Sequence, residues 1–565
     1  MGYMARTVGI GRQDFEKIRI KNNFYVDKTC FIKEWWEADD DVTLITRPRR
    51  FGKTLNMSMT EKFFSVKYSG RMDLFEGLSI WEEEDYREIQ GTYPVIGLTF
   101  ANVKETNLEG AKRCICQILA DLYDKHIFLL DGTVLTENEK AYFRSVTNGM
   151  EDTTAIWTIH KLSDFLSRYY GRKAIILLDE YDTPMQEAYM NGYWDEMVCF
   201  IRSLFNTTFK TNPYYERAIM TGITRVSKES VFSDLNNLKV ITTTSAEYAD
   251  CFGFTEKEVF QALDEFGLSD KKQDVKSWYD GFTFGQCMDI YNPWSIINYL
   301  DTEKFDTYWA NTSSNGLVGT LIREGSKEVK KDFERLLSGE EITTAIEEQI
   351  VYKQLYFKKN AVWSLLLASG YLKVAGTGFS EETRRFYYKL ALTNKEVRIM
   401  FEDMIRDWFS ENDHYNDFIQ ALLLDDLDEM NTYMNEIAMD SFSYFDTGKK
   451  SSEENPERFY HGFVLGLMVE LTNRYMLTSN RESGLGRYDV MLEPNQQNDD
   501  AIIFEFKVFQ PKKEKDLSDT VNTALKQIED MNYEAALIAR GFPPERIRKY
   551  GFAFRGKEVL IGKMK

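Results

Sequence analysis

The chain has 565 residues, of which 43% are hydrophobic and 14% aromatic, and its formal net charge is −20. At about 150 residues per domain, this length predicts three or four domains. The composition excludes disordered and collagen-like classes. Residues 446–565 are charge-balanced, so the negative charge resides in residues 1–445. A chain this acidic is not a generic basic coat for nucleic acid.

The sequence contains no segment that we expect to enter a membrane. No run approaches 18 consecutive apolar residues, and the first residues lack the apolar stretch of a signal peptide. The six cysteines form no CxxC pair and have no histidine at zinc-ligand spacing, which favours buried, reduced thiols over metal ligands. We therefore predict a cytoplasmic protein that makes no membrane contact.

Residues 20–245 alternate short apolar runs with amphipathic stretches, which is typical of α/β folds. The apolar runs lack a polar face, as expected for strands of a parallel sheet covered on both sides. We predict strands at 42–46, 95–100, 174–178 and 218–223, with helices at 108–126 and 158–170.

The rest of the chain has a different pattern. A capped helix is predicted to begin near Phe254, in a mainly helical segment. Further on, a helix over 362–371 precedes a hairpin over 372–392 and another helix from Asn394, a succession that suggests a winged-helix module. The final segment reads as a compact α/β unit. The predicted domains are 1–245 (parallel α/β), 246–345 (helical lid), 346–445 (winged-helix-like and helical connector) and 446–565 (compact α/β).

A phosphate-binding loop is predicted directly after the first strand. Residues 47–54 read Arg-Pro-Arg-Arg-Phe-Gly-Lys-Thr and lead into a helical run over 55–64. Backbone N–H groups of such a loop and the helix N-terminus face an anion. Lys53 would reach the β- and γ-phosphates of a nucleotide, and the Thr54 hydroxyl would ligate Mg²⁺. Arg47 stands where the general GxxxxGK[ST] motif has glycine, so a chance surface loop remains an alternative at this point.

Two later strand ends support the nucleotide interpretation. The apolar strand at 174–178 ends in Asp179 and Glu180, where the first can hold Mg²⁺ and the second can polarise the attacking water. The strand at 218–223 ends in Thr224 and Arg225, which we expect near the γ-phosphate. The predicted nucleotide contacts are Arg49, Arg50, Phe51, Gly52, Lys53, Thr54, Asp179, Thr224 and Arg225; Glu180 is the predicted catalytic residue. The basic cluster of Arg47, Arg49 and Arg50 is expected to serve the phosphates.

These motifs resemble those of the AAA-ATPase-like proteins of bacteria. The resemblance rests on residues 25–29 (Tyr-Val-Asp-Lys-Thr), 47–54, 178–182 (Leu-Asp-Glu-Tyr-Asp), 221–225 (Thr-Gly-Ile-Thr-Arg), 278–282 (Trp-Tyr-Asp-Gly-Phe) and 291–295 (Tyr-Asn-Pro-Trp-Ser). Arginine at the first loop position is usual in that family. The resemblance implies a P-loop, AAA-like sheet and a C-terminal nuclease domain of the PD-(D/E)XK type, with a restriction-endonuclease-like α/β fold. Fold is implied more strongly than biological role.

Near the C-terminus, charged residues converge on a predicted hairpin. Asp489 lies in its first strand, while Glu505 and Lys507 alternate onto one face of its second strand. Asp489 and Glu505 would hold Mg²⁺, and Lys507 would orient water or stabilise the phosphate for phosphodiester hydrolysis. An exposed strand with outward-facing charges is the alternative on spacing alone. Glu457, at the start of an upstream helix, is a further candidate metal ligand, or it only serves the helix dipole.

Residues 540–565 hold eight lysines and arginines against two glutamates. This excess predicts either a footprint for a phosphate backbone or a solvated terminal face.

The sequence therefore predicts a P-loop protein that binds and hydrolyses ATP, coupled to Mg²⁺-dependent cleavage of nucleic acid. DNA is expected over RNA as the substrate, and a homo-oligomer is allowed. The alternative is a nucleotide-gated switch whose C-terminal domain binds nucleic acid or another partner without cleaving it. A third reading, a scaffold with two relic sites, conflicts with the intact candidate residues.

Overall fold

The computed structural model describes most of the 565 residues. The described residues are 6–225, 232, 235–310, 316–323, 326–337, 339–347, 355, 358–381, 384–410, 413–441, 464, 468, 471, 474–479, 482–483, 486–495 and 499–564. They form two compact units: residues 1–321 with 339–398, and residues 322–338 with 399–565. Among the described helices, none is long and apolar enough to cross a lipid bilayer.

The first unit is built on a five-stranded parallel sheet in the order β2-β3-β4-β1-β5. Its strands are β1 (Val42–Thr46), β2 (Val95–Thr99), β3 (Ala174–Asp179), β4 (Tyr215–Gly222) and β5 (Leu238–Ile241). The four predicted strands are confirmed within a few residues, and β5 was missed. All residues of β1 and β3 are buried, as their continuous apolarity indicates.

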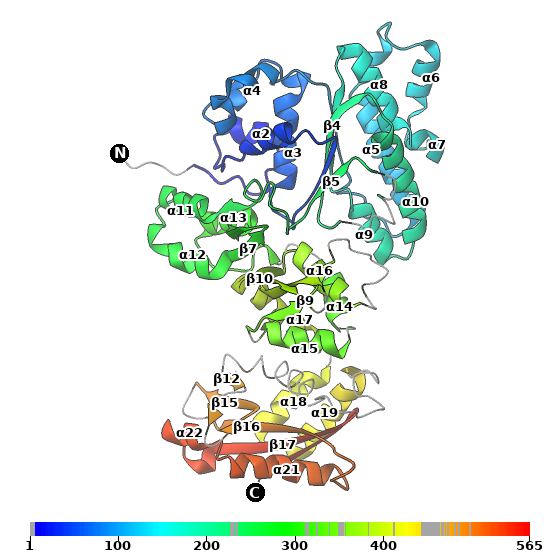
Figure 1. The fold of residues 1–565 in the computed structure, drawn as a ribbon. Helices are drawn as coiled ribbons and strands as arrows, with labels where there is room; N and C mark the ends of the chain where they lie inside the picture. Colours follow the sequence, from blue (N-terminus) through cyan, green and yellow to red (C-terminus); the bar gives the residue numbers. More distant parts are fainter. Residues whose placement is uncertain are drawn as a thin grey trace. The chain divides into compact units, whose positions relative to one another are not determined.

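Helices cover both faces of this sheet (Figure 1). On one face lie α2 (Cys30–Ala38), α3 (Lys53–Phe64) and α4 (Glu84–Ile89); on the other lie α5 (Leu108–Asp124), α8 (Thr158–Tyr170) and α10 (Trp194–Phe205). The remaining helices of this part are α1 (Phe15–Ile20), α6 (Glu137–Ser145), α7 (Asp152–Ala155) and α9 (Thr183–Met190). The two helices predicted at 108–126 and 158–170 are therefore present.

The aromatic core beneath α3 includes Trp35, Phe63 and Phe64, all fully buried against strand residues such as Ile45. The six cysteines are distributed differently from the prediction. Only Cys116 and Cys251 are buried and Cys199 is exposed, so the expectation of uniformly buried thiols is wrong.

The segment after the parallel sheet is mainly helical but also contains a small sheet. Helix α11 (Glu256–Glu265) begins with a capping box between Thr255 and Glu258, as the sequence predicts. It is followed by α12 (Lys272–Tyr279) and α13 (Pro293–Thr302), with the three-stranded antiparallel sheet β6-β8-β7 among them. The strands β6 (Phe254–Thr255), β7 (Asp280–Phe284) and β8 (Cys287–Tyr291) were missed because they are short.

Further along the chain, helix α16 (Lys359–Ala368) precedes the predicted hairpin, formed by β10 (Leu372–Ser380) and β11 (Arg385–Leu392). Strand β9 (Ile342–Thr344) pairs with β11 as a third strand. The other helices are α14 (Gly316–Arg323), α15 (Lys327–Leu337), α17 (Lys395–Ser410), α18 (Asp413–Leu424) and α19 (Leu427–Ser441).

The second unit contains a mixed sheet in the order β12-β15-β16-β17-β18. Its strands are β12 (Tyr475–Ser479), β15 (Val490–Pro494), β16 (Ala501–Val508), β17 (Ile547–Arg555) and β18 (Glu558–Lys563), and β13 (Glu482–Ser483) pairs with β14 (Gly486–Arg487) separately. Only the β16–β17 pair is parallel. Helices α18 and α19 pack on one face, and α21 (Leu517–Asp530) covers the other, with α22 (Ala535–Ala539) following it (Figure 1).

Candidate functional site

The phosphate-binding loop lies between the end of β1 and the start of α3. Arg50 and Gly52 both have left-handed backbones, with φ of 64° and 81°. Alternation of such conformations turns successive N–H groups toward one point, which makes a concave site for an anion. A Cβ at Gly52 would meet nothing within 4 Å, so the space directly beside this residue is open. The local geometry is that of a phosphate cradle.

Four predicted residues meet at this loop. The Lys53 ammonium donates to the backbone carbonyl of Arg47 at 3.1 Å and lies 3.4 Å from Glu180 Oε1. The Thr54 hydroxyl donates to Asp179 Oδ2 at 2.6 Å. These contacts join α3 to the end of β3, so two sequence segments 125 residues apart form one site.

The environment of Asp179 is suited to a cation. This carboxylate is only 5% exposed; burial raises its pKa, and the charge of Glu180 raises it further. Hydrogen bonds from the hydroxyls of Thr221 and Thr54 act in the opposite direction. A carboxylate beside a hydroxyl is the oxygen donor set that Mg²⁺ prefers. Asp179 and Thr54 therefore fit the predicted Mg²⁺ ligands.

Asp182 is a member of this site that the sequence reasoning did not single out. Its buried carboxylate accepts hydrogen bonds from the backbone N–H and the hydroxyl of Thr224, both at 2.9 Å. Burial and then the charge of Glu180 raise its pKa. Thr224 thus supports Asp182 through its hydroxyl, whereas Arg225 is half-buried at the end of this segment. The signal was present in the run 178–182, which ends in a third acidic residue.

Arg47 does not serve the phosphates, contrary to the expectation for the basic cluster. Its side chain is fully buried and donates to carbonyl groups, including that of Thr242 at 2.7 Å. Its guanidinium lies over the Phe284 ring, 4.6 Å from the centroid. Burial lowers its pKa to about 10, although the charges of Cys251 and Glu247 oppose this shift. Arg47 therefore replaces the motif glycine by a structural cation that holds the loop onto the core.

Segments after the parallel sheet contact the loop directly. The backbone carbonyl of Arg49 accepts hydrogen bonds from the Asn292 side chain at 3.3 Å and from the Trp309 indole at 3.0 Å. The Arg50 guanidinium stacks over Trp294, 4.3 Å from the ring centroid. These interactions give the 291–295 motif a physical role, because it fixes the outer half of the loop.

The 278–282 motif also packs against the phosphate loop. Phe51 packs edge-on against Phe282, with ring centroids 4.7 Å apart. Gly281 has a φ of 135°, and a Cβ there would lie 2.0 Å from the backbone oxygen of Thr393. Only glycine fits this close approach. Phe51 is therefore a packing residue of the loop.

The candidate nuclease residues converge in the second unit. In the β15–β16 pair Val490 lies opposite Phe504, so Asp489 approaches the following residue, Glu505. The Asp489 carboxylate accepts a hydrogen bond from the backbone N–H of Phe506 at 2.8 Å, and burial raises its pKa. Lys507 Nζ lies 3.0 Å from Glu505 Oε1. The predicted juxtaposition of the three side chains across the hairpin is confirmed.

This cluster lies on the face of the sheet that α21 covers. Glu505 is 1% exposed, so the alternative of an exposed, solvated strand is wrong at this position. Tyr533 is buried nearby and its hydroxyl accepts from Gln527 at 3.0 Å. The charges of Glu505 and Asp489 both contribute to raising the Tyr533 pKa, after burial. Two carboxylates beside a lysine fit an oxygen-ligated divalent cation. Glu457 lies outside the described residues.

The basic residues of 540–565 are not a tail. Four of the eight lie in β17 and β18, and six of the seven that the structure describes form ion pairs with acidic neighbours. Arg546 and Arg548, for example, both pair with Asp500. Their charge is therefore largely compensated within the domain, which weakens the expectation of a phosphate footprint there.

A polar cavity of about 490 Å³ occurs at the opposite end of the parallel sheet from the loop. Asp39, Lys173 and Tyr215 line it, at the amino ends of β1, β3 and β4. Ligands of parallel α/β sheets bind at the carboxyl ends of the strands. The loop of residues 47–54, and not this cavity, lies at the carboxyl ends of these strands.

Two family models match this chain, and each covers the region that contains one of the two candidate sites. A family model described as a predicted AAA-ATPase matches residues 9–232, and the model of the PD-(D/E)XK nuclease superfamily matches residues 455–564. The chain is 24% identical over 549 residues to an Azotobacter chroococcum mcd 1 protein described as an uncharacterized protein in the vnfD 5′ region, with 94% of each chain covered. The solved Aeropyrum pernix ORC2 protein, in its ADPNP-ADP complexes, is 10% identical with a TM-score of 0.25, covering 71% of this chain and 96% of that one. The chain therefore joins an N-terminal AAA-ATPase-like domain to a C-terminal domain of the PD-(D/E)XK nuclease superfamily.

Proposed function

We propose that this protein is a cytoplasmic enzyme that binds and hydrolyses ATP at the loop of residues 47–54 and cleaves DNA at the hairpin cluster. The observation that carries the first part is the meeting of Lys53, Thr54, Asp179 and Glu180 at a helix N-terminus. The observation that carries the second is the grouping of Asp489, Glu505 and Lys507.

At the nucleotide site, each residue has a distinct task. Backbone N–H groups of the loop bind the phosphates, and Lys53 moves from its loop carbonyls to the phosphate oxygens. Thr54 and Asp179 would hold Mg²⁺, which neutralises charge developing on the phosphates. Glu180 has a left-handed backbone with a φ of 53° and orients the attacking water. The ion pair between Glu180 and Lys53 keeps both side chains at the site before nucleotide arrives.

At the nuclease site, the carboxylates of Asp489 and Glu505 would hold Mg²⁺, which lowers the pKa of bound water and stabilises charge on the phosphate. Lys507 then exchanges its bond to Glu505 for one to a phosphate oxygen or the water. Burial of Glu505 excludes bulk water and strengthens these electrostatic interactions.

A second function is favoured by one specific contact. The Lys507 ammonium already bonds Glu505 at 3.0 Å and the backbone oxygen of Phe506 at 3.2 Å. If this ion pair persists with DNA bound, the domain binds without cutting, and the protein is a nucleotide-gated switch.

The decisive experiment compares full-length wild type with Lys53→Ala and Lys507→Ala. Phosphate release from ATP is measured, together with cleavage of plasmid and single-stranded DNA in Mg²⁺ or Mn²⁺, with and without ATP. Exposed lysines provide matched controls: Lys125→Ala for the first variant and Lys513→Ala for the second.

Lys53→Ala is expected to lower ATP turnover by about 100-fold or more, and Lys507→Ala to lower cleavage to a similar degree. Loss of cleavage in Lys53→Ala as well would establish coupling between the two activities. ATP turnover with no cleavage of any tested DNA would favour the switch. Wild-type ATP turnover in Lys53→Ala would refute the nucleotide assignment.

A further inference from the structure

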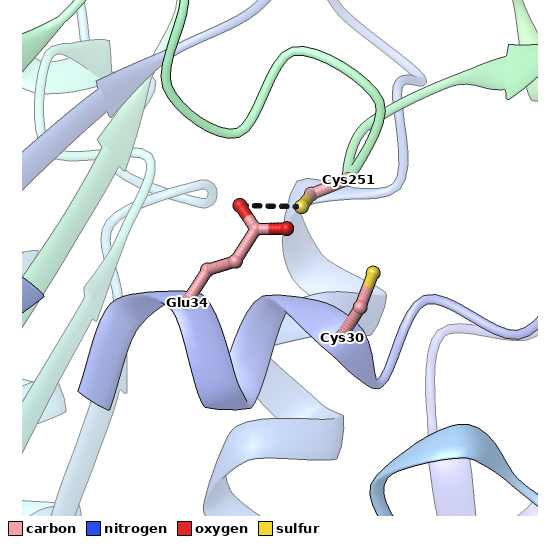
Figure 2. A group of neighbouring side chains, drawn as sticks. All are labelled: Cys30, Glu34 and Cys251. Atoms are coloured by element: carbon pink, nitrogen blue, oxygen red, sulfur yellow. Dashed lines mark hydrogen bonds between the residues drawn. The ribbon is translucent and has the colours of Figure 1, made fainter. Parts of the chain in front are cut away.

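Two cysteines and a glutamate from distant parts of the chain meet in the first unit (Figure 2). They are Cys30, Glu34 and Cys251, and one ligand atom from each lies within 4.8 Å of the other two. The Cys251 thiol donates a hydrogen bond to Glu34 Oε2 at 3.6 Å. This cluster lies outside both sites described above.

The fold places these side chains for simple geometric reasons. Cys30 is the first residue of α2 and Glu34 follows it four residues later, so the two share one face of the helix. Cys251 lies between two left-handed residues, Tyr248 and Gly253, in the segment that faces this helix. The segment is held in place by Asn56 of α3, whose side chain donates to the Cys251 carbonyl at 2.9 Å.

We propose that Cys30, Glu34 and Cys251 bind a zinc ion. Typical zinc–sulfur and zinc–oxygen bonds in a tetrahedron require sulfur–oxygen separations of about 3.6 Å and sulfur–sulfur separations of about 3.8 Å. The 3.6 Å separation between Cys251 Sγ and Glu34 Oε2 already matches the first value. Asp250 Oδ1 lies 3.9 Å from Cys251 Sγ but outside the group of three ligand atoms, so the fourth ligand would be water or Asp250 after a side-chain movement.

The chemistry of the donor set selects the kind of metal. Thiolates favour Zn²⁺ and disfavour Mg²⁺, so this site is distinct from those expected at Asp179 and Asp489. The Lys28 ammonium donates to both carboxylate oxygens of Glu258 at 2.7 Å and so has its own counter-charge, and the buried Arg47 guanidinium donates to backbone carbonyls. Two thiolates with one or two carboxylates therefore carry a negative charge that a divalent cation would balance.

The two thiols shift each other's pKa in opposite directions. The Cys251 thiol hydrogen-bonds to Cys30 and lowers the pKa of Cys30, whereas the pKa of Cys251 is raised by this bond and by burial. Burial and the charge of Asp250 raise the pKa of Glu34.

A metal at this position would connect helix α2 to the segment of residues 247–251, which contacts Arg47 of the phosphate loop. Arg47 donates to the carbonyls of Glu247 and Tyr248, each at 3.3 Å, in the same segment that carries Cys251. The proposed zinc is thus structural, because it holds the segment 247–251 that accepts hydrogen bonds from Arg47 and from Asn56 of α3. It does not depend on the proposed ATPase or nuclease activity.

The test uses the full-length chain, purified without chelator and then loaded with Co²⁺ in place of zinc. Zinc content is measured by elemental analysis, and sulfur-to-cobalt charge transfer is measured as near-ultraviolet absorption. We expect about one zinc per chain and a thiolate–cobalt band in the wild type. Cys251→Ser and Cys30→Ser each lose the band, and Cys199→Ser, at an exposed cysteine, retains it.

Two further variants keep the result interpretable. Glu34→Gln preserves both thiols and the fold; we expect at least a tenfold weaker zinc affinity by chelator competition. A double variant, Asp179→Asn with Glu505→Gln, removes the two magnesium candidates and is expected to retain the thiolate–cobalt band. Absence of the band in folded wild type, or a Cys30–Cys251 disulfide found by mass spectrometry in protein kept under reducing conditions, would overturn the proposal.

Discussion

The Glu396 carboxyl group is buried against Ser295 and Trp309, in segments that contact the phosphate loop, and its titration predicts a pH dependence of stability. It is 0% exposed and accepts hydrogen bonds from Ser295 Oγ at 2.8 Å and from the backbone N–H of Trp309 at 2.5 Å. Ser295 follows Trp294, the residue on which Arg50 stacks. The protonation state of Glu396 is therefore linked to the segments that hold the loop.

Burial raises the Glu396 pKa from 4.5 to about 7; the hydrogen bonds from Ser295 and from the backbone at residues 309 and 310 oppose this shift, and the charge of Asp306 adds to it. A carboxyl group whose folded pKa exceeds its unfolded pKa binds more protons when folded. Its stabilising contribution is therefore fully present below pH 4.5 and is lost as the pH rises toward 7. The loss between pH 5 and pH 8 is about 2–3 kcal/mol.

The perturbation is Glu396→Gln, which keeps the acceptor oxygen and removes the titration. Urea unfolding at pH 5 and pH 8 is followed by tryptophan fluorescence. We expect the wild type to lose about 2–3 kcal/mol more than the variant between these two pH values. Glu137→Gln, at an exposed glutamate, should behave as the wild type. Equal pH dependence in the wild type and Glu396→Gln would refute the reasoning.

Three further outcomes follow from the loop and its supports. Gly281→Ala should lower the free energy of unfolding by about 2–5 kcal/mol, because its φ of 135° and the 2.0 Å approach to the Thr393 backbone oxygen leave no room for a Cβ. The control is Gly149→Ala, where a Cβ meets nothing within 4 Å, and equal urea midpoints for the two variants would contradict the prediction. Arg47→Gly restores the glycine of the general motif, yet it should lower the free energy of unfolding by about 3–5 kcal/mol, since buried carbonyls lose their hydrogen-bond donor. An unchanged thermal unfolding midpoint would show that the guanidinium is dispensable. Asp182→Asn should lower the free energy of unfolding by about 1–3 kcal/mol and reduce phosphate release, because the new amide N–H would face the N–H and hydroxyl donors of Thr224. Unchanged ATP turnover and stability would show that Asp182 does not support the site.

The local architecture of the first unit could be predicted from short stretches of sequence. Continuous apolar runs identified four of the five parallel strands, and the capping pattern identified the start of α11. The phosphate loop, the acidic end of β3 and the hairpin bearing Glu505 were readable because each lies within a short window of residues. Periodicity, caps and turns are short-range properties, so one stretch of chain specifies them.

The contacts between side chains that are distant in the sequence could not be predicted, because they depend on how the chain folds. The sequence predicted Arg47 as a phosphate ligand, because its hydrogen-bond partner, the carbonyl of Thr242, lies far away in the chain. Cys30 and Cys251 lie close together although more than two hundred residues separate them. The basic residues of 540–565 read as an unbalanced patch because their acidic partners, such as Asp500, lie elsewhere in the sequence. Burial, pairing and pKa depend on topology and packing, and no local pattern specifies which distant groups will compensate a charge.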